Sequence, residues 1–138
     1  MPMTDHEIFE QIRPIIVEAL GVDLEQVTLD ARLTDDLAAE SIDYLDIFFR
    51  LEQRFGIKIE AGDKLIRTLT EDERLVLDGT ITDEGLEELR RRLPGVSLAP
   101  LEQSRDIRDF LSIFTGEALV RMVQTRLAED HGLTDATA

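Results

Sequence analysis

DLAAESIDYLDIFF, residues 36–49, is the stretch that decides the fold, because an acidic loop ends here and an amphipathic helix begins. At about 100° per residue, the apolar positions of residues 41–55 separate into two stripes on different faces of that helix. The first stripe is the expected core face, and its members are Tyr44, Ile47, Phe48, Leu51 and Phe55.

The second stripe is formed by Ile42, Leu45 and Phe49, more than about 100° from the centre of the first. Its neighbours on the helix are polar: Asp43, Asp46, Arg50, Glu52 and Gln53. A small bundle does not need to bury both stripes, so we expect a docking patch with an acidic rim. The alternative is that residues 61–112 cover this stripe as part of the core.

Ser41 stands at the point where this helix begins. Serine is common there as a helix N-cap, but an exposed hydroxyl at a helix N-terminus is also suited to carrying an attached phosphate. Position alone does not separate these two readings. A hydrolytic nucleophile is not expected, because the G-x-S-x-G motif is absent and the two histidines, His6 and His131, stand near opposite ends of the chain. We therefore predict no catalytic residues.

The rest of the chain is patterned mainly for helices. Thr4 and Glu7 have the spacing of a capping box, and a helical period then runs to Gly21, which predicts a helix over residues 4–20. After the helix at 41–55 we expect a helix around 70–77, a turn at Asp78-Gly79, a helix from Thr82 to about Leu93 and a capped segment from Pro100. The closing helix is predicted over residues 113–127, with fraying from about Ala128.

Composition narrows the possible functions. The chain has 138 residues with 43% hydrophobic content and a net charge of −15, which repels nucleic acids and anionic lipid and favours basic protein surfaces. There is no cysteine, no calcium-loop spacing and no phosphate-binding glycine loop, so neither a metal nor a nucleotide site is predicted. No apolar run approaches the ~18 residues of a membrane span, and the N-terminus is too acidic for a signal peptide. We expect a cytoplasmic protein.

Several short motifs follow one another in an order that resembles the acyl carrier proteins. They are LGV at 20–22, EQVT at 25–28, D-L-x-A-x-S-I-D at 36–43, RFGIKI at 54–59 and IFTGEALVRMV at 113–123. The resemblance implies an all-α fold with a four-helix bundle. It also implies that Ser41 receives 4′-phosphopantetheine from coenzyme A through a phosphopantetheinyl transferase. An imported thiol fits a chain that has no cysteine of its own.

The resemblance further implies a non-catalytic carrier of thioester-bound acyl chains in fatty acid, polyketide or specialised lipid synthesis. Its partners would be the transferase and acyl synthases and acyltransferases with basic docking surfaces, engaged by a monomer. The docking residues would be Asp36, Ile42, Asp43, Leu45, Asp46, Phe49 and Glu52. The alternative function is an unmodified acidic interaction module on a carrier-like scaffold, in which Ser41 is only a cap.

The largest departure from the family pattern is a long segment before the last helix. We expect residues 1–60 and 113–138 to form the carrier bundle and residues 61–112 to form an inserted helical subdomain that tunes acyl or partner choice. This segment holds the basic cluster Arg90, Arg91 and Arg92, and it could pack against the acidic bundle.

Overall fold

The computed structural model describes residues 3–59 and 63–137 of the chain. Its elements, in chain order, are α1 (Asp5–Leu20), the 3-10 helix η1 (Leu24–Gln26), α2 (Ser41–Phe55), α3 (Asp63–Thr70), β1 (Val76–Leu77), β2 (Thr80–Ile81), α4 (Asp83–Arg92), α5 (Ala99–Ser104), the 3-10 helix η2 (Ile107–Ile113) and α6 (Gly116–Thr137). The all-α prediction is confirmed, since the β1–β2 hairpin is the only sheet in the described part of the chain.

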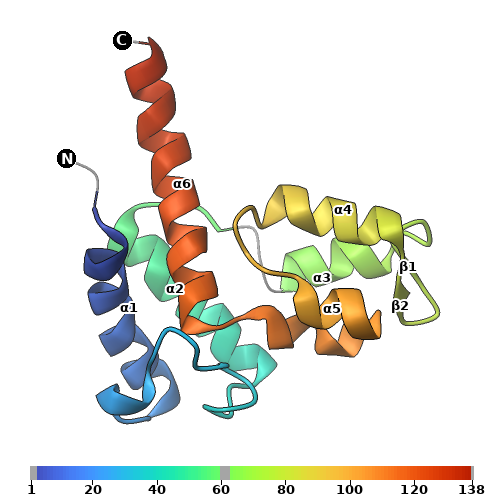
Figure 1. Cartoon of the computed structure of the whole chain (residues 1–138), viewed down its shortest axis with the longest axis horizontal. Helices are drawn as coiled ribbons and strands as arrows, with labels where there is room; N and C mark the ends of the chain where they lie inside the picture. Colours follow the sequence, from blue (N-terminus) through green and yellow to red (C-terminus); the bar gives the residue numbers. More distant parts are fainter. Residues whose placement is uncertain (1–2, 60–62, 138) are drawn as a thin grey trace.

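The 3-10 helix η2 packs mainly against α5, whereas the three long helices α1, α2 and α6 pack against one another and form the bundle (Figure 1). Each contributes the apolar face that its sequence period predicts. The buried side chains include Ile8, Ile12 and Ile16 of α1, Tyr44, Ile47 and Leu51 of α2, and Leu119, Val120 and Val123 of α6.

The first two helices begin and end where the sequence predicts. The Thr4 hydroxyl accepts a hydrogen bond from the Glu7 N–H at 3.1 Å, while the Thr4 N–H donates to Glu7 Oε1 at 2.9 Å. Gly21 ends α1 and Gly56 ends α2, both in the left-handed conformation that glycine adopts without strain (φ 69° and 66°). These signals lie within one turn of each helix end, which is why the sequence alone reveals them.

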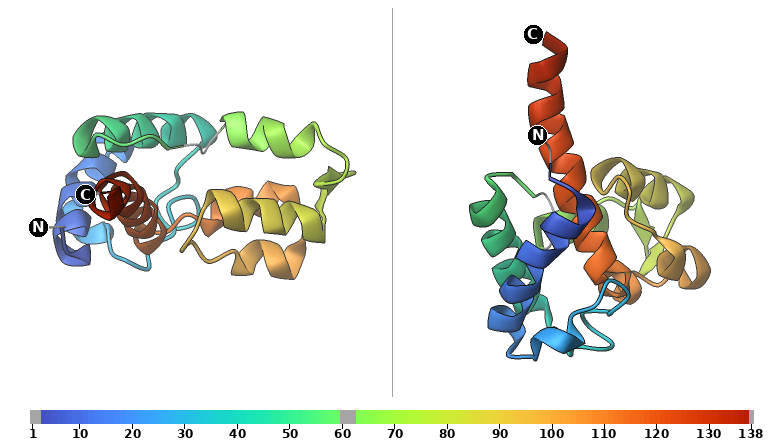
Figure 2. Two further views of the ribbon diagram at one scale, coloured as in Figure 1. Left: turned by 90° about the horizontal axis from the view of Figure 1, so that it is seen from above. Right: turned by 60° about the vertical axis from the view of Figure 1, so that its left-hand side comes forward.

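Helices α3, α4 and α5 and the hairpin form a lobe beside the bundle (Figure 2). The helix expected around residues 70–77 is wrong: α3 ends at Thr70, and residues 76–77 form β1. Asp78 and Gly79 both have positive φ, 52° and 79°, the conformation of a two-residue turn that joins antiparallel strands. The expected α4 is confirmed, with Thr82 as its N-cap.

The last helix differs from the prediction at both ends. It begins at Gly116 rather than 113, because the Thr115 hydroxyl caps it by accepting from the Ala118 N–H at 3.0 Å. It continues to Thr137, where fraying from about Ala128 was expected. Residues here lack an apolar period, but Ala128 and Glu129 favour helix and Arg126 pairs with Glu129 at 3.1 Å.

The lobe and the bundle share one continuous hydrophobic cluster. The residues that the lobe adds to it include Leu65, Leu69, Val76, Ile81, Leu86, Leu89, Leu93 and Leu101. Their contact with the bundle does not depend on the basic cluster. Each of its arginines has a glutamate partner inside the lobe, for example Arg90 with Glu102 at 3.0 Å and Arg92 with Glu88 at 2.9 Å.

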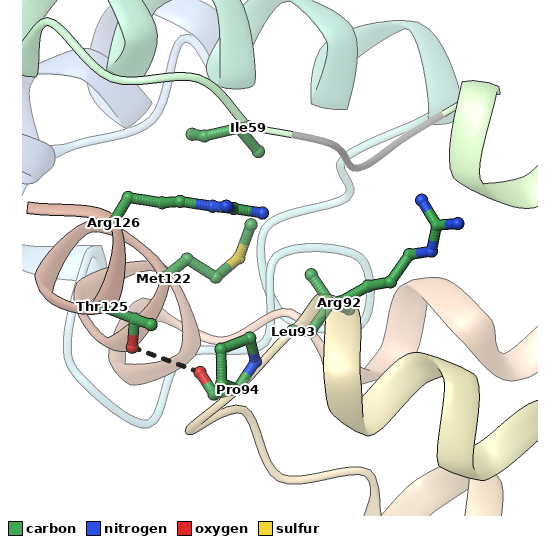
Figure 3. Close-up of a pocket in the computed structure, with 7 residues that line it drawn as sticks. All are labelled: Ile59, Arg92, Leu93, Pro94, Met122, Thr125 and Arg126. Atoms are coloured by element: carbon green, nitrogen blue, oxygen red, sulfur yellow. Dashed lines mark hydrogen bonds between the residues drawn. The ribbon is translucent and has the colours of Figure 1, made fainter. Parts of the chain in front are cut away.

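The loop that follows α4 contacts α6 and so links the lobe to the bundle. The Thr125 hydroxyl donates to the Pro94 carbonyl at 3.3 Å, and a small pocket beside this bond is lined by Ile59 from the bundle side and by Leu93, which follows α4 (Figure 3). Among residues 3–59 and 63–137, no helix combines the length and the apolar character that crossing a membrane requires.

Candidate functional site

Ser41 is the first residue of α2, and its side chain is exposed. Glu40 is the N-cap residue, in an extended conformation (φ −103°, ψ 169°), and the Asp43 carboxylate accepts from the Glu40 N–H at 2.8 Å. Ser41 is therefore not the N-cap that one reading of the sequence expected. Within the described residues nothing hydrogen-bonds its hydroxyl.

The backbone around this hydroxyl is suited to an anion. The N–H groups of Ser41 and Ile42 open α2 and have no acceptor among the described residues. Free N–H groups and the positive end of the helix dipole favour a phosphate at this position. A phosphodiester on Ser41 therefore fits the site as it stands.

The loop that leads to Ser41 is held firmly. The Arg32 N–H donates to Asp36 Oδ2 at 2.8 Å, and the Ala39 N–H donates to the Leu33 carbonyl at 2.8 Å. The Leu33 N–H in turn donates to the Phe114 carbonyl at 3.1 Å, which ties the loop to the segment before α6. Ser41 is thus presented on a backbone fixed from both sides.

A cluster of four aromatic rings fills the interior beneath this end of α2. Tyr44, Phe48, Phe110 and Phe114 are all buried, and their neighbouring ring centroids lie 5.3–6.0 Å apart. The Tyr44 hydroxyl lies 2.7 Å from Thr34 Oγ1 and donates to the Leu111 carbonyl at 3.3 Å. Burial raises the pKa of Tyr44 to about 12, so the ring stays neutral.

The sequence placed Tyr44 and Phe48 on the core face but did not predict this cluster. The i,i+4 spacing of Phe110 and Phe114 signals a pair on one side of a helical turn. The sequence does not reveal that this pair meets α2, because the two segments are far apart along the chain. Tyr44 and Leu111, which are hydrogen-bonded, are 67 positions apart.

The second stripe of α2 is exposed. The exposed fractions are 70% for Ile42, 43% for Leu45 and 59% for Phe49, so the alternative that residues 61–112 cover this stripe is wrong. We call these three residues the exposed apolar stripe. Scattered single apolar residues are ordinary on surfaces, but three on one helix face form a patch that suits a partner.

The acidic residues predicted around this stripe all take part in intramolecular contacts. Asp43 holds the start of α2, as described above, and Asp36 accepts from the loop backbone. Glu52 Oε2 accepts from the Ile59 N–H at 2.9 Å, and Asp46 Oδ1 accepts from Arg50 Nε at 2.9 Å. The structure thus brings the predicted docking residues to one helix and the loop before it.

The described residues do not meet the requirements of a metal site. No group of three or more His, Asp or Glu side chains there could hold a metal ion. His6 is exposed on α1, where Glu10 lies 3.9 Å away, whereas Ser41 begins a different helix, α2.

Comparison with known proteins bears directly on this region. Residues 10–71 match the family model described as the phosphopantetheine attachment site. Two bacterial relatives are both named acyl carrier protein: that of Petrotoga mobilis is 48% identical over 58 residues, and that of Thermotoga maritima is 47% identical over 57 residues. These alignments cover 42% and 41% of this chain and 68% and 70% of the relatives.

A third relative, the acyl carrier protein of Guillardia theta, is 46% identical over 57 residues, which are 41% of this chain and 70% of that protein. The matched family model spans residues 10–71, which include Ser41 and the whole of α2. Identity of this order over more than two thirds of each relative shows that the chain belongs to the acyl carrier protein family.

Proposed function

We propose that Ser41 is the residue that carries the prosthetic group of this acyl carrier protein. The observation that supports the proposal is the exposed Ser41 hydroxyl, free of hydrogen bonds among the described residues, at the N-terminus of α2. Its place inside the range matched by the attachment-site model adds to that support.

Members of this family are carriers rather than catalysts, and their prosthetic group is 4′-phosphopantetheine, attached covalently. When bound, the group supplies the thiol that holds an acyl chain as a thioester, which a chain without cysteine cannot supply itself. The chain's own contribution is to present the hydroxyl on a fixed backbone and to keep the surrounding surface accessible.

Attachment needs no base on this chain. The Ser41 oxygen forms a bond to phosphorus, the pyrophosphate bond of coenzyme A breaks, and the nucleotide bisphosphate leaves. The serine proton must pass to a base of the transferase, because no histidine is placed beside Ser41 in the described residues. The free N–H groups of Ser41 and Ile42 would stabilise the negative charge that stays on the phosphodiester.

The family's partners are a phosphopantetheinyl transferase and the synthases and acyltransferases that act on the bound acyl chain. We propose that they dock on the exposed apolar stripe and the acids beside it through basic surfaces of their own. We also propose that the carrier works as a monomer, because outside the exposed apolar stripe the large exposed apolar side chains of the described chain are few: Leu24, Leu29 and Leu77.

We propose further that residues 61–112 are an inserted helical subdomain that tunes acyl or partner choice. Its α3, α4 and α5 lie together on one side of the bundle (Figure 2), and the arginines of its basic cluster pair with its own glutamates. The Leu111 carbonyl, however, accepts from the Tyr44 hydroxyl of α2, and the Phe110 ring packs on Phe114, which contacts Tyr44 and Phe48 of α2. We therefore expect a Gly/Ser linker in place of 61–104 to leave Ser41 loadable, whereas a linker in place of 61–112 weakens the bundle. Equal stability of the two deletion variants, measured by urea unfolding, would contradict this boundary.

The attachment site is tested by mass. The purified protein is incubated with coenzyme A and a broad-specificity phosphopantetheinyl transferase, and its intact mass is measured before and after. The expected result is one phosphopantetheine per chain, lost in Ser41→Ala but kept in Ser112→Ala, a matched control at a serine outside α2. No gain in the parent protein would favour the unmodified interaction module.

A further inference from the structure

Arg50 lies between two acidic side chains beside the exposed apolar stripe, on the proposed docking face of α2. Its Nε donates to Asp46 Oδ1 at 2.9 Å, and its Nη1 donates to Glu18 Oε2 of α1 at 2.8 Å. The exposed fraction is 37% for the Arg50 side chain, 45% for that of Asp46 and 70% for that of Glu18. This is a surface bridge between α1 and α2 rather than a buried pair.

The spacing on the helix favours a pair between Arg50 and Asp46. An acid four residues before a base on a helix is the better of the two orientations, and the guanidinium is charged at every physiological pH. The hydrogen bond that Arg50 donates to Asp46 raises the pKa of Arg50 further. Asp46 therefore meets a partner with its charge already balanced.

Among the acids beside the exposed apolar stripe, Asp46 is the one whose charge is most closely balanced by a neighbouring cation. It lies one turn from both Ile42 and Arg50 on α2, next to the exposed apolar stripe. Asp36 has a cation nearby as well, but the distance from Arg32 Nε to its Oδ2 is longer, 3.8 Å. Asp43 and Glu52 accept from backbone N–H groups, and no ion pair with a cationic side chain is found for either of them among the described residues.

We propose that Arg50 masks Asp46 and thereby weakens the attraction between this docking face and basic protein surfaces, so that partners are selected more by the exposed apolar stripe than by charge. A basic side chain of a partner that binds Asp46 has to displace Arg50, and its positive charge is then repelled by that of the nearby Arg50 guanidinium. Acidic partner-binding helices attract such surfaces at long range, and an internal cation at the rim lowers that attraction selectively at one position.

The inference rests on the proposed role of Ser41 and is tested on the full chain with the same transferase and coenzyme A. Arg50→Gln removes the mask, and Arg54→Gln is the matched control. Arg54 is on the same helix, one turn further on, and its Nε donates to the uncharged Gln11 Oε1 at 2.9 Å. Both substitutions change the net charge by the same amount, so a difference between them reports the position and not the total charge.

We expect kcat/KM for loading of Ser41 at low ionic strength to rise about two- to five-fold in Arg50→Gln, the range set by exposed ion pairs, and to rise less in Arg54→Gln. The gain should shrink as salt is added, because screening removes long-range attraction. In an Asp46→Asn background, Arg50→Gln should have no larger effect than Arg54→Gln. Circular dichroism of each variant checks that the helices are intact.

Three results overturn the inference: equal rates for Arg50→Gln and Arg54→Gln, a gain independent of salt, or a gain that persists in the Asp46→Asn background. Each of these leaves the proposed function standing, because the parent protein is still loaded. Absence of loading in the parent protein itself overturns the proposed function, and the inference with it.

Discussion

Phe114 is the residue whose truncation should damage this protein most. Its ring is fully buried and lies 5.3 Å from the ring centroid of Tyr44 and 5.5 Å from those of Phe48 and Phe110. Its backbone carbonyl also accepts from the Leu33 N–H of the loop before Ser41. Side chains of α2, η2 and the segment before α6 thus meet at one ring.

Phe114→Ala should lower the free energy of unfolding by about 3–5 kcal/mol, the cost of removing a buried phenyl ring that its surroundings cannot replace. Three ring contacts worth about 0.5–1.5 kcal/mol each place the expected value at the upper end of that range. With a urea m-value of about 1–3 kcal/mol/M, the unfolding midpoint should fall by more than about 1 M.

Phe49→Ala is the matched control, since it removes the same ring from an exposed position of α2, and it should change stability by less than about 0.5 kcal/mol. Urea unfolding followed by circular dichroism measures both variants. Should Phe114→Ala fail to fold, Phe114→Leu provides the measurement, with an intermediate loss expected. The reasoning is refuted if Phe114→Leu and Phe49→Ala unfold at the same midpoint as the parent protein.

Three further predictions follow from single contacts. Ser41→Ala should abolish loading, which intact mass tests, yet change the free energy of unfolding by less than about 0.5 kcal/mol, because the hydroxyl does not cap α2. Thermal unfolding measures this change, and a loss of stability above about 1 kcal/mol would show that Ser41 caps the helix after all. Gly116→Ala should destabilise by about 1–3 kcal/mol in urea unfolding, since the added Cβ would lie 2.3 Å from the Thr28 carbonyl oxygen; parent-like stability would mean that the loop yields freely. The pKa of Tyr44 is raised to about 12, so the neutral Tyr44 side chain stabilises the folded state fully below its ordinary pKa of 10.0, and this stabilisation is lost as the pH rises toward 12. Tyr44→Phe should therefore lose less stability between pH 10 and pH 12 than the parent protein does. Identical stability profiles against pH for the two proteins would contradict the prediction.

The sequence predicts well those features that short-range signals specify. The ends of α1 and α2 follow from a capping box and two glycines, and the exposed apolar stripe follows from helical geometry alone. The helix expected around 70–77 is wrong, because α3 ends at Thr70 and residues 76–77 form a strand. The Asp78-Gly79 turn, which requires positive φ at both positions, pairs Val76 with Ile81 instead.

Long-range contacts were beyond such reasoning. Glu18 and Arg50 are 32 positions apart, and only the packing of α1 against α2 brings the carboxylate within 2.8 Å of the guanidinium. The ring cluster is similar, because it needs the chain to return from the lobe before Phe110 and Phe114 can meet Tyr44. The candidate site was thus predictable as a serine and a helix face, but its supports and its masking cation were not.

Ala38 shows how these long-range contacts act on the attachment site. It has φ 60°, a left-handed conformation that costs a residue with a Cβ about 1–2 kcal/mol, and it stands three residues before Ser41. The conformation persists because its surroundings over-determine it: Leu37 and Ala39 on either side are buried, and the Ala39 N–H is bonded to Leu33. Leu33 is held in turn by the Phe114 carbonyl. The strain at Ala38 is therefore balanced by packing that starts in the aromatic cluster, which means that the position of the Ser41 hydroxyl depends on Phe114, more than 70 positions away along the chain.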